Sequence, residues 1–142
     1  VCAFINIDIE AVGNWSERRG IAYSGYTDLA ARAETYGLIR DCIEQVNAEL
    51  AADPLMDRTQ VHRFLVLHKE LDPDDDELTR TRKVRRKFIA EKYAVLISAL
   101  YDGKATQYIE TQVKFEDGRL GSTSADLQIW DSKTYRPQGL AA

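Results

Sequence analysis

A basic cluster at residues 78–87 is the part of the sequence best suited to chemistry. It reads Leu-Thr-Arg-Thr-Arg-Lys-Val-Arg-Arg-Lys, so six of the eight residues from Arg80 to Lys87 are basic, and an acidic run at 70–77 precedes it. The cluster opens a predicted amphipathic helix, although the positive end of a helix dipole favours Asp or Glu in the first turn. A placement that opposes helix stability indicates a function, and this charge predicts contact with an anion such as phosphate.

Within the cluster, Lys83 is the candidate catalytic residue. Lysine carries a compact positive charge on a flexible arm, so it can reach a phosphate and a carboxylate together. Two other interpretations stay open. In the first, the cluster is a solvated basic face of a helix, the usual role of a charge run. In the second it binds nucleic acid, which is disfavoured because no aromatic residues are interleaved and no nucleic-acid-binding motif is present.

The remaining polar candidates carry weaker signals. His62 and His68 bracket a predicted strand, but no Cys or carboxylate joins them at the spacing of metal ligands, so no metal site is predicted. The acidic run at 72–77 lacks the glycine and the ligand pattern of an EF-hand, and a solvated loop is expected there. Glycine-rich phosphate loops and the serine nucleophile motif are absent from the sequence.

Length and composition predict one globular domain. The chain has 142 residues, is 44% hydrophobic and carries a formal net charge of -4, which argues against a general nucleic-acid binder. Cys2 and Cys42 do not form a disulfide framework, so we expect free thiols and a cytoplasmic location. No apolar run reaches the length of a transmembrane segment, and no signal peptide is expected. Because the chain opens with the apolar stretch Val1–Ile5, we expect a fragment of a longer protein.

The elements that must position these residues are predicted from the spacing of apolar side chains. Alternation predicts strands, and helical spacing predicts helices. The expected strands are 1–9, 62–68, 108–115 and 120–130, and the expected helices are 11–19, about 27–50 and about 84–101. An Asp-Gly pair within 116–119 predicts a hairpin between the last two strands. The predicted fold class is therefore α+β, a small sheet with a C-terminal β-hairpin packed against helices.

The motif around Lys83 extends from Leu78 to Arg86 in the pattern Leu-Thr-x-Thr-x-Lys-x-Arg-Arg. Tyr93 follows within the predicted helix, and Tyr101-Asp102-Gly103 follows at its end. In these features the chain resembles the C-terminal domain of AMP-forming long-chain fatty acyl-CoA synthetases, members of the adenylate-forming superfamily. The opening strand and the first helix are similar as well, and the resemblance covers most of the chain.

The resemblance implies a mobile C-terminal lid domain at residues 1–132, followed by a loose tail at 133–142. It implies a ligase that activates a fatty acid with ATP to acyl-adenylate and then forms acyl-CoA. ATP and CoA are the implied co-substrates, with Mg²⁺ accompanying ATP, and none is expected to bind tightly to this fragment. The implied partner is a missing N-terminal adenylate-binding domain of the same chain. Peripheral association of the full-length enzyme with a membrane is left open.

In this resemblance Lys83 matches the adenylation lysine, which bridges carboxylate and phosphate oxygens as negative charge develops. Arg82, Arg85 and Arg86 become candidates for contacts with phosphates of ATP or CoA. We expect Lys83 to be exposed and the isolated fragment to be inactive, because the domain that holds the substrates lies outside this chain. The alternative function is a stand-alone binding module that uses the basic helix start to hold an anionic partner.

Overall fold

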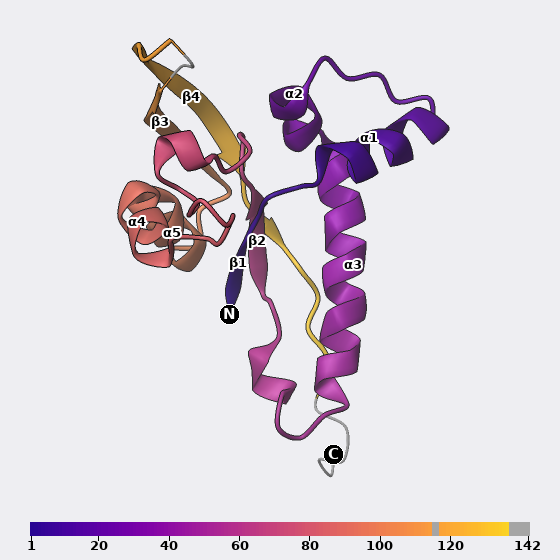
Figure 1. Cartoon of the computed structure of the whole chain (residues 1–142). Coiled ribbons are helices and arrows are strands. Elements are labelled where there is room, and N and C mark those ends of the chain that lie inside the picture. Colours follow the sequence, from indigo (N-terminus) through magenta and orange to yellow (C-terminus); the bar gives the residue numbers. More distant parts are fainter. Residues whose placement is uncertain (115–116, 137–142) are drawn as a thin grey trace.

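Five helices and five strands make up the part of the chain that this computed structural model describes, residues 1–114 and 117–136 (Figure 1). The helices are α1 (Ile9–Arg18), α2 (Tyr26–Ala31), α3 (Ala33–Ala51), α4 (Arg86–Lys92) and α5 (Ala94–Tyr101). The strands are β1 (Cys2–Ile5), β2 (Arg63–Val66), β3 (Thr106–Lys114), β4 (Leu120–Gln128) and β5 (Trp130–Asp131). Two short 3-10 helices, η1 (Asp57–Thr59) and η2 (Pro73–Asp75), lie in the connections. The predicted α+β class is confirmed.

A three-stranded sheet lies at the centre, in the order β1-β2-β5. β1 runs parallel to β2, with Cys2 opposite Arg63, and β5 runs antiparallel on the other side of β2. The middle strand β2 has Phe64, Leu65 and Val66 fully buried. This run of apolar side chains is typical of a strand that is covered on both faces.

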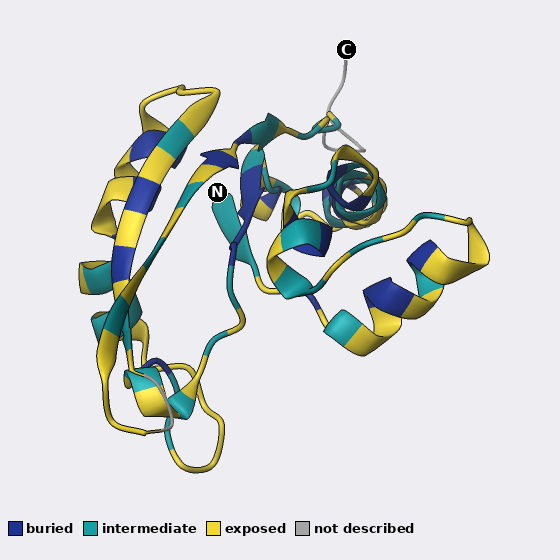
Figure 2. Ribbon diagram, turned by 90° about the horizontal axis from the view of Figure 1, so that it is seen from above, coloured by how far each residue is buried: buried dark blue, intermediate teal, exposed yellow. Residues whose placement is uncertain are grey.

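Each face of β2 supports its own hydrophobic core, because alternate side chains of a strand point to opposite faces. Leu65 and Leu67 pack with residues of α5 and of the β3–β4 hairpin, whereas Phe64 and Val66 pack with residues of α1, α2 and α3. Figure 1 shows α3 on one side of the sheet and the α4–α5 pair on the other. Figure 2 shows buried positions interspersed with exposed ones along the helices and strands. The basic cluster therefore belongs to the α4–α5 side of the molecule.

β3 and β4 form the predicted C-terminal hairpin. Their antiparallel register pairs Thr106 with Gln128 at one end and Lys114 with Leu120 at the other, so the two strands pair along their whole length. Residues 115 and 116, which belong to the predicted strand and turn, lie outside the described residues. The hairpin covers one edge of the core on the α5 side.

The single strand predicted at 120–130 is wrong, because this segment is divided between two sheets. β4 ends at Gln128, and β5 begins at Trp130 beside β2. The carbonyl of Gln128 accepts a hydrogen bond from the hydroxyl of Tyr36 on α3, at 2.8 Å. This contact, made by a residue of α3, lies at the point where the chain changes from one sheet to the other. An alternating sequence pattern does not predict such a change.

The two long predicted helices are each divided in two. Extended backbone at Arg32 (φ −72°, ψ 139°) separates α2 from α3, and Tyr93 (φ −106°, ψ 24°) separates α4 from α5. The helix predicted from about Val84 also begins later, at Arg86, because Val84 pairs with Leu78 in an isolated antiparallel bridge. Apolar spacing continues across these interruptions, so the pattern predicts single helices.

The two ends of the chain differ from the expected pattern in small ways. The strand predicted at 1–9 ends at Ile5 because Asp8 caps α1 and accepts hydrogen bonds from its first amides. In the predicted tail, the amide of Lys133 donates to Glu44 and the amide of Tyr135 donates to Gln60. Residues 137–142 of that tail lie outside the described residues, and the division of the chain at residue 132 stays a prediction. Among the described residues, no helix has the length and apolar character needed to cross a membrane.

Candidate functional site

The segment between the acidic run and α4 is a closed hairpin turn, residues 78–85, which we call the basic turn. The amide of Thr79 donates to the carbonyl of Lys83 at 2.8 Å, and the amide of Arg82 donates to the carbonyl of Thr79 at 2.9 Å. The hydroxyl of Thr79 accepts from the amide of Lys83 at 3.0 Å. Arg82 has a left-handed backbone (φ 61°), which reverses the chain. Placing Lys83 in the first turn of a helix was therefore wrong, since its backbone is bound within the hairpin.

Lys83 is exposed, as predicted, and its side chain forms no ion pair with any described residue. Arg82 and Arg86 are also exposed, and neither has an ion pair within residues 1–114 and 117–136. These three side chains are available to an external anion. Their charges come from two adjoining elements, the basic turn and the start of α4.

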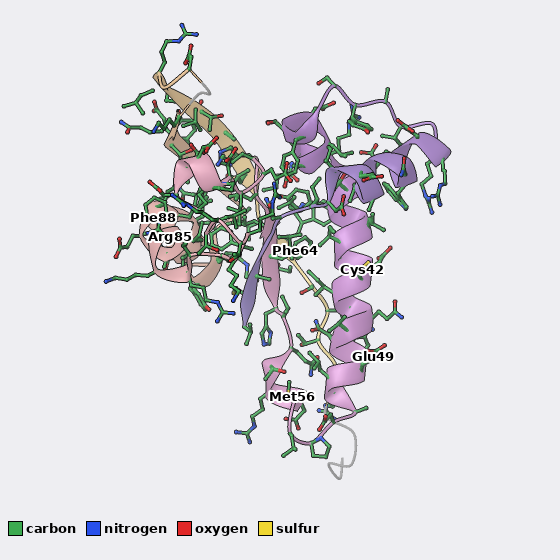
Figure 3. The ribbon with its side chains drawn as sticks, in the orientation of Figure 1. Cys42, Glu49, Met56, Phe64, Arg85 and Phe88 are labelled. Carbon is green, nitrogen blue, oxygen red and sulfur yellow. The ribbon has the colours of Figure 1, made fainter. Side chains whose placement is uncertain are left out.

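Arg85 has partners within the chain. Its guanidinium lies 3.5 Å from the carboxylate of Asp76 and 5.3 Å from the ring centroid of Phe88 (Figure 3). A shallow depression of about 390 Å³ lies beside it and is lined by Arg85, Arg86, Lys87, Phe88 and Glu91. The structure thus brings Arg85 and Arg86 to one depression, whereas Arg82 and Lys83 lie in the turn and do not line it.

The basic turn is preceded by Glu77, whose carboxylate is completely buried. This carboxylate accepts hydrogen bonds from the ammonium of Lys69 and the hydroxyl of Tyr93, and it lies 3.2 Å from the ammonium of Lys92. Lys69 also contacts the carboxylate of Asp75 at 2.8 Å. We call Lys69, Asp75, Glu77, Lys92 and Tyr93 the Glu77 cluster. A buried carboxylate persists only where it is paired and hydrogen-bonded, and both conditions hold here.

The contacts within the cluster set its charges. Burial raises the pKa of Glu77, but hydrogen bonds from Lys69 and Tyr93 and the charges of Lys69 and Lys92 outweigh it and leave this pKa below its ordinary value. Burial also opposes ionisation of Asp75, and the hydrogen bond from Lys69 again helps to lower its pKa. Burial and the Glu77 carboxylate raise the pKa of Tyr93, so its phenol remains a hydrogen-bond donor. Both carboxylates are therefore ionised at neutral pH.

Reading Glu77 as part of a solvated acidic loop was wrong. Its partners Lys69 and Tyr93 lie 8 and 16 positions away in the sequence, and no periodic pattern connects them to it. Tyr93 stood out only as a residue that follows the motif around Lys83. The sequence contained the members of the cluster but no signal that they meet.

The two histidines lie in different environments. His62 is exposed, whereas His68 is buried and neither of its ring nitrogens has a hydrogen-bond partner among the described residues. Burial, followed by the charge of Lys69, lowers the pKa of His68, so its ring is neutral at pH 7. In the described ranges, no group of three or more His, Cys, Asp or Glu side chains could hold a metal ion.

Several curated proteins are similar to this chain in sequence. The chain is 33% identical over 101 residues to the long-chain-fatty-acid–CoA ligase FadD15 of Mycobacterium tuberculosis, and equally to FadD15 of Mycobacterium bovis. It is 32% identical over 99 residues to FadD11 of Mycobacterium tuberculosis, which is provisionally named a fatty-acid–CoA ligase. Each match covers 70% of this chain but only 16% of the relative, so the chain spans a small part of these proteins.

No protein-family model and no solved structure match the chain. The curated relatives nevertheless confirm the resemblance that the motif around Lys83 indicated. The α+β fold with its C-terminal antiparallel hairpin agrees with it. By sequence, the chain is therefore related to part of the fatty-acid–CoA ligases FadD15 and FadD11.

Proposed function

We propose that this chain is the C-terminal lid domain of a long-chain fatty acid–CoA ligase. In the first half-reaction, the complete enzyme joins a fatty acid and ATP into acyl-adenylate and pyrophosphate. In the second, the thiol of CoA attacks the acyl carbonyl and AMP leaves. FadD15 is named as a long-chain-fatty-acid–CoA ligase, and its similarity to this chain supports the same chemistry here.

The observation that carries the proposal is the presentation of Lys83 on an ordered turn. Its side chain is exposed and has no ion pair with a described residue, while hydrogen bonds to Thr79 hold its amide and its carbonyl. When a carboxylate oxygen attacks the α-phosphorus of ATP, negative charge gathers on neighbouring oxygens. A fixed positive charge at that point lowers the barrier. Among the described residues, Lys83 has no ion pair that would have to break before its ammonium contacts the substrates.

The arginines around Lys83 supply phosphate contacts in this proposal. A guanidinium binds phosphate oxygens through parallel N–H donors, which a lysine cannot do. Arg85 and Arg86 line the depression at the start of α4, and Arg82 lies next to Lys83 in the basic turn. Phosphates of ATP or CoA are the ligands that this charge fits.

The remaining parts of the reaction come from outside this chain. The partner is the adenylate-binding domain of the same enzyme, which would hold the fatty acid and ATP. ATP, with its Mg²⁺, and CoA act as co-substrates that reach this domain only when the two domains meet. The location proposed for the reaction is the cytoplasm.

Lys83→Ala in the complete enzyme tests the proposal by separating the half-reactions. Pyrophosphate release from ATP and a long-chain fatty acid is expected to fall by a factor on the order of 10² or more, as removal of one electrostatic stabiliser typically causes. Thioester formation from preformed acyl-adenylate and CoA is expected to continue near its normal rate. The reason is that no bond between carboxylate and phosphate forms in that step.

Lys104→Ala is the control, because Lys104 is exposed and lies outside the basic turn. It removes the same charge and should leave both half-reactions unchanged. If Lys83→Ala slows the two half-reactions equally, Lys83 is a folding or docking residue and the proposed role is wrong.

A further inference from the structure

We propose that Glu77 is the positioning residue for Lys83. It holds the basic turn in one orientation relative to β2 and α4, so that the Lys83 ammonium reaches the reacting oxygens at one place. The inference rests on the proposed function of Lys83 and adds a residue that acts through it, without contact with the substrates.

Glu77 is joined to Lys83 through the backbone of the basic turn. The carbonyl of Glu77 accepts a hydrogen bond from the amide of Arg85 at 3.0 Å, which closes the base of the basic turn. An antiparallel bridge forms the next step, and the amide of Thr79 then donates to the carbonyl of Lys83 at 2.8 Å. Because these contacts follow one another without a gap, a shift of Glu77 moves the backbone of Lys83.

The side chain of Glu77 is held from several elements at once. Lys69 follows β2, Lys92 is the last residue of α4, and Tyr93 lies between α4 and α5. The amide of Asp72 adds a further hydrogen bond at 3.2 Å. Since these partners approach from different parts of the fold, they restrict the carboxylate in more than one direction.

Asp75 connects the Glu77 cluster to the β3–β4 hairpin. Its carboxylate contacts Lys69 at 2.8 Å and accepts the amide of Lys114, on β3, at 2.9 Å. The acidic run before the turn is therefore attached to β3 as well as to the end of β2. The turn thus has a fixed base, while the side chain of Lys83 at its far end stays exposed.

A purely structural role for Glu77 is the competing explanation, because breaking a buried ion pair commonly destabilises a fold. The two explanations differ in what happens when Lys83 is absent. If Glu77 only positions Lys83, substituting it does not change the rate of a variant that lacks Lys83. If Glu77 is structural, substituting it lowers the activity both with and without Lys83.

The test compares Glu77→Gln, Lys83→Ala and the double variant in the complete enzyme. Glu77→Gln keeps the size of the side chain and removes its charge. Its kcat for adenylate formation is expected to fall roughly 10- to 100-fold, as loss of a supporting residue commonly causes, with KM for ATP changing less. In the Lys83→Ala background the same substitution is expected to cause no further loss. Glu49→Gln, exposed on α3 and distant from α4 in Figure 3, is the matched control and should leave both rates unchanged.

The outcomes separate this inference from the proposed function. Normal adenylation in Glu77→Gln, together with a loss in Lys83→Ala, overturns the positioning role alone. An equal further loss in the double variant shows a structural role and overturns it too. Normal adenylation in Lys83→Ala overturns the proposed function itself. If Glu77→Gln does not fold, Tyr93→Phe replaces it in the test. This substitution removes one hydrogen-bond donor to Glu77 and keeps the ring, and its effect is again compared with and without Lys83→Ala.

A second measurement does not depend on catalysis. Trypsin cleaves after Lys and Arg, and six such residues lie between Arg80 and Lys87. In the folded protein, cleavage within this segment is expected to be several-fold faster in Glu77→Gln than in Glu49→Gln, because the turn opens more often. Equal cleavage rates in the two variants would show that Glu77 does not hold the turn.

Discussion

Glu77 and Lys83 belong to one short segment, yet the fold gives their charges opposite surroundings. The carboxylate of Glu77 is buried among Lys69, Lys92 and Tyr93, whereas the ammonium of Lys83 is exposed. The buried charge is restrained, because a displacement would weaken its contacts with these partners. The exposed charge is available to an external anion. At the scale of single residues, we therefore propose that Glu77 holds the segment in place and that Lys83 contacts the substrates.

Acid is expected to weaken the Glu77 cluster. The folded pKa of Glu77 lies below its ordinary value of 4.5, and that of Asp75 lies below 3.8. Each carboxylate therefore contributes stability that is complete above its ordinary pKa and is lost as the pH falls through its folded pKa. Urea unfolding followed by tryptophan fluorescence should show the free energy of unfolding decreasing below about pH 4.5.

Two variants isolate the contribution of Glu77 to this pH dependence. Glu77→Gln should lose less stability than the wild type below pH 4.5, because the group that titrates is absent. Glu49→Gln should keep the wild-type slope. Buried His68, whose folded pKa lies below 6.5, adds a loss of stability as the pH falls below 6.5. Because the Glu77 charge raises this pKa, that loss is expected to be larger in Glu77→Gln than in the wild type. Identical slopes in wild type and Glu77→Gln would contradict the prediction.

At the scale of elements, α5 packs its apolar face into the core and contacts α4, the helix that follows the basic turn. Leu96 is fully buried in the core that also contains Tyr93 and Leu65, while Ile97 is only partly buried. The short α4 has no buried residue of its own and depends on this neighbour. The orientation of the basic cluster is therefore linked to the packing of α5.

Leu96→Ala is expected to cost about 2–5 kcal/mol in the free energy of unfolding, since it leaves a cavity in the core. Val95→Ala is the matched control, because Val95 is 43% exposed in the same helix turn and should change stability by about 0.5 kcal/mol or less. Thermal or urea unfolding measures both variants. A Leu96→Ala protein as stable as the wild type would show that this face carries little of the packing energy.

At the scale of the whole molecule, two hydrophobic cores share the strand β2. Because β2 is covered on both faces, the two halves of the chain are expected to fold together as one unit. The relatives that match this chain are much longer, since the match covers 16% of their length. Positioning of the substrates would thus depend on residues that this chain does not contain.

The purified 142-residue chain is therefore expected to fold but to lack ligase activity. In the proposed function, Lys83 without the domain that would hold carboxylate and ATP loses the benefit of proximity. A single cooperative unfolding transition would show the fold, and pyrophosphate release from ATP and a long-chain fatty acid would measure activity. The complete enzyme in the same assay is the control. Appreciable pyrophosphate release by the chain alone would contradict this expectation.

The sequence by itself determined the features that depend on neighbouring residues. Alternation and helical spacing located most strands and helices, and the Asp-Gly pair indicated the C-terminal hairpin. The motif from Leu78 to Arg86 indicated the resemblance to fatty-acid–CoA ligases, and that resemblance predicted the exposure of Lys83. Local chain geometry and solvation dictate these features, so they can be read in order along the chain.

Only the tertiary structure decided the features that depend on contacts between distant segments. It divided the helices at Arg32 and Tyr93, placed Lys83 in a turn instead of a helix, and moved the chain between sheets after Gln128. It also buried Glu77 among partners from β2, α4 and the α4–α5 junction. The reason is physical: whether a carboxylate is solvated or buried depends on the donors that the fold brings to it, not on its neighbours in the chain.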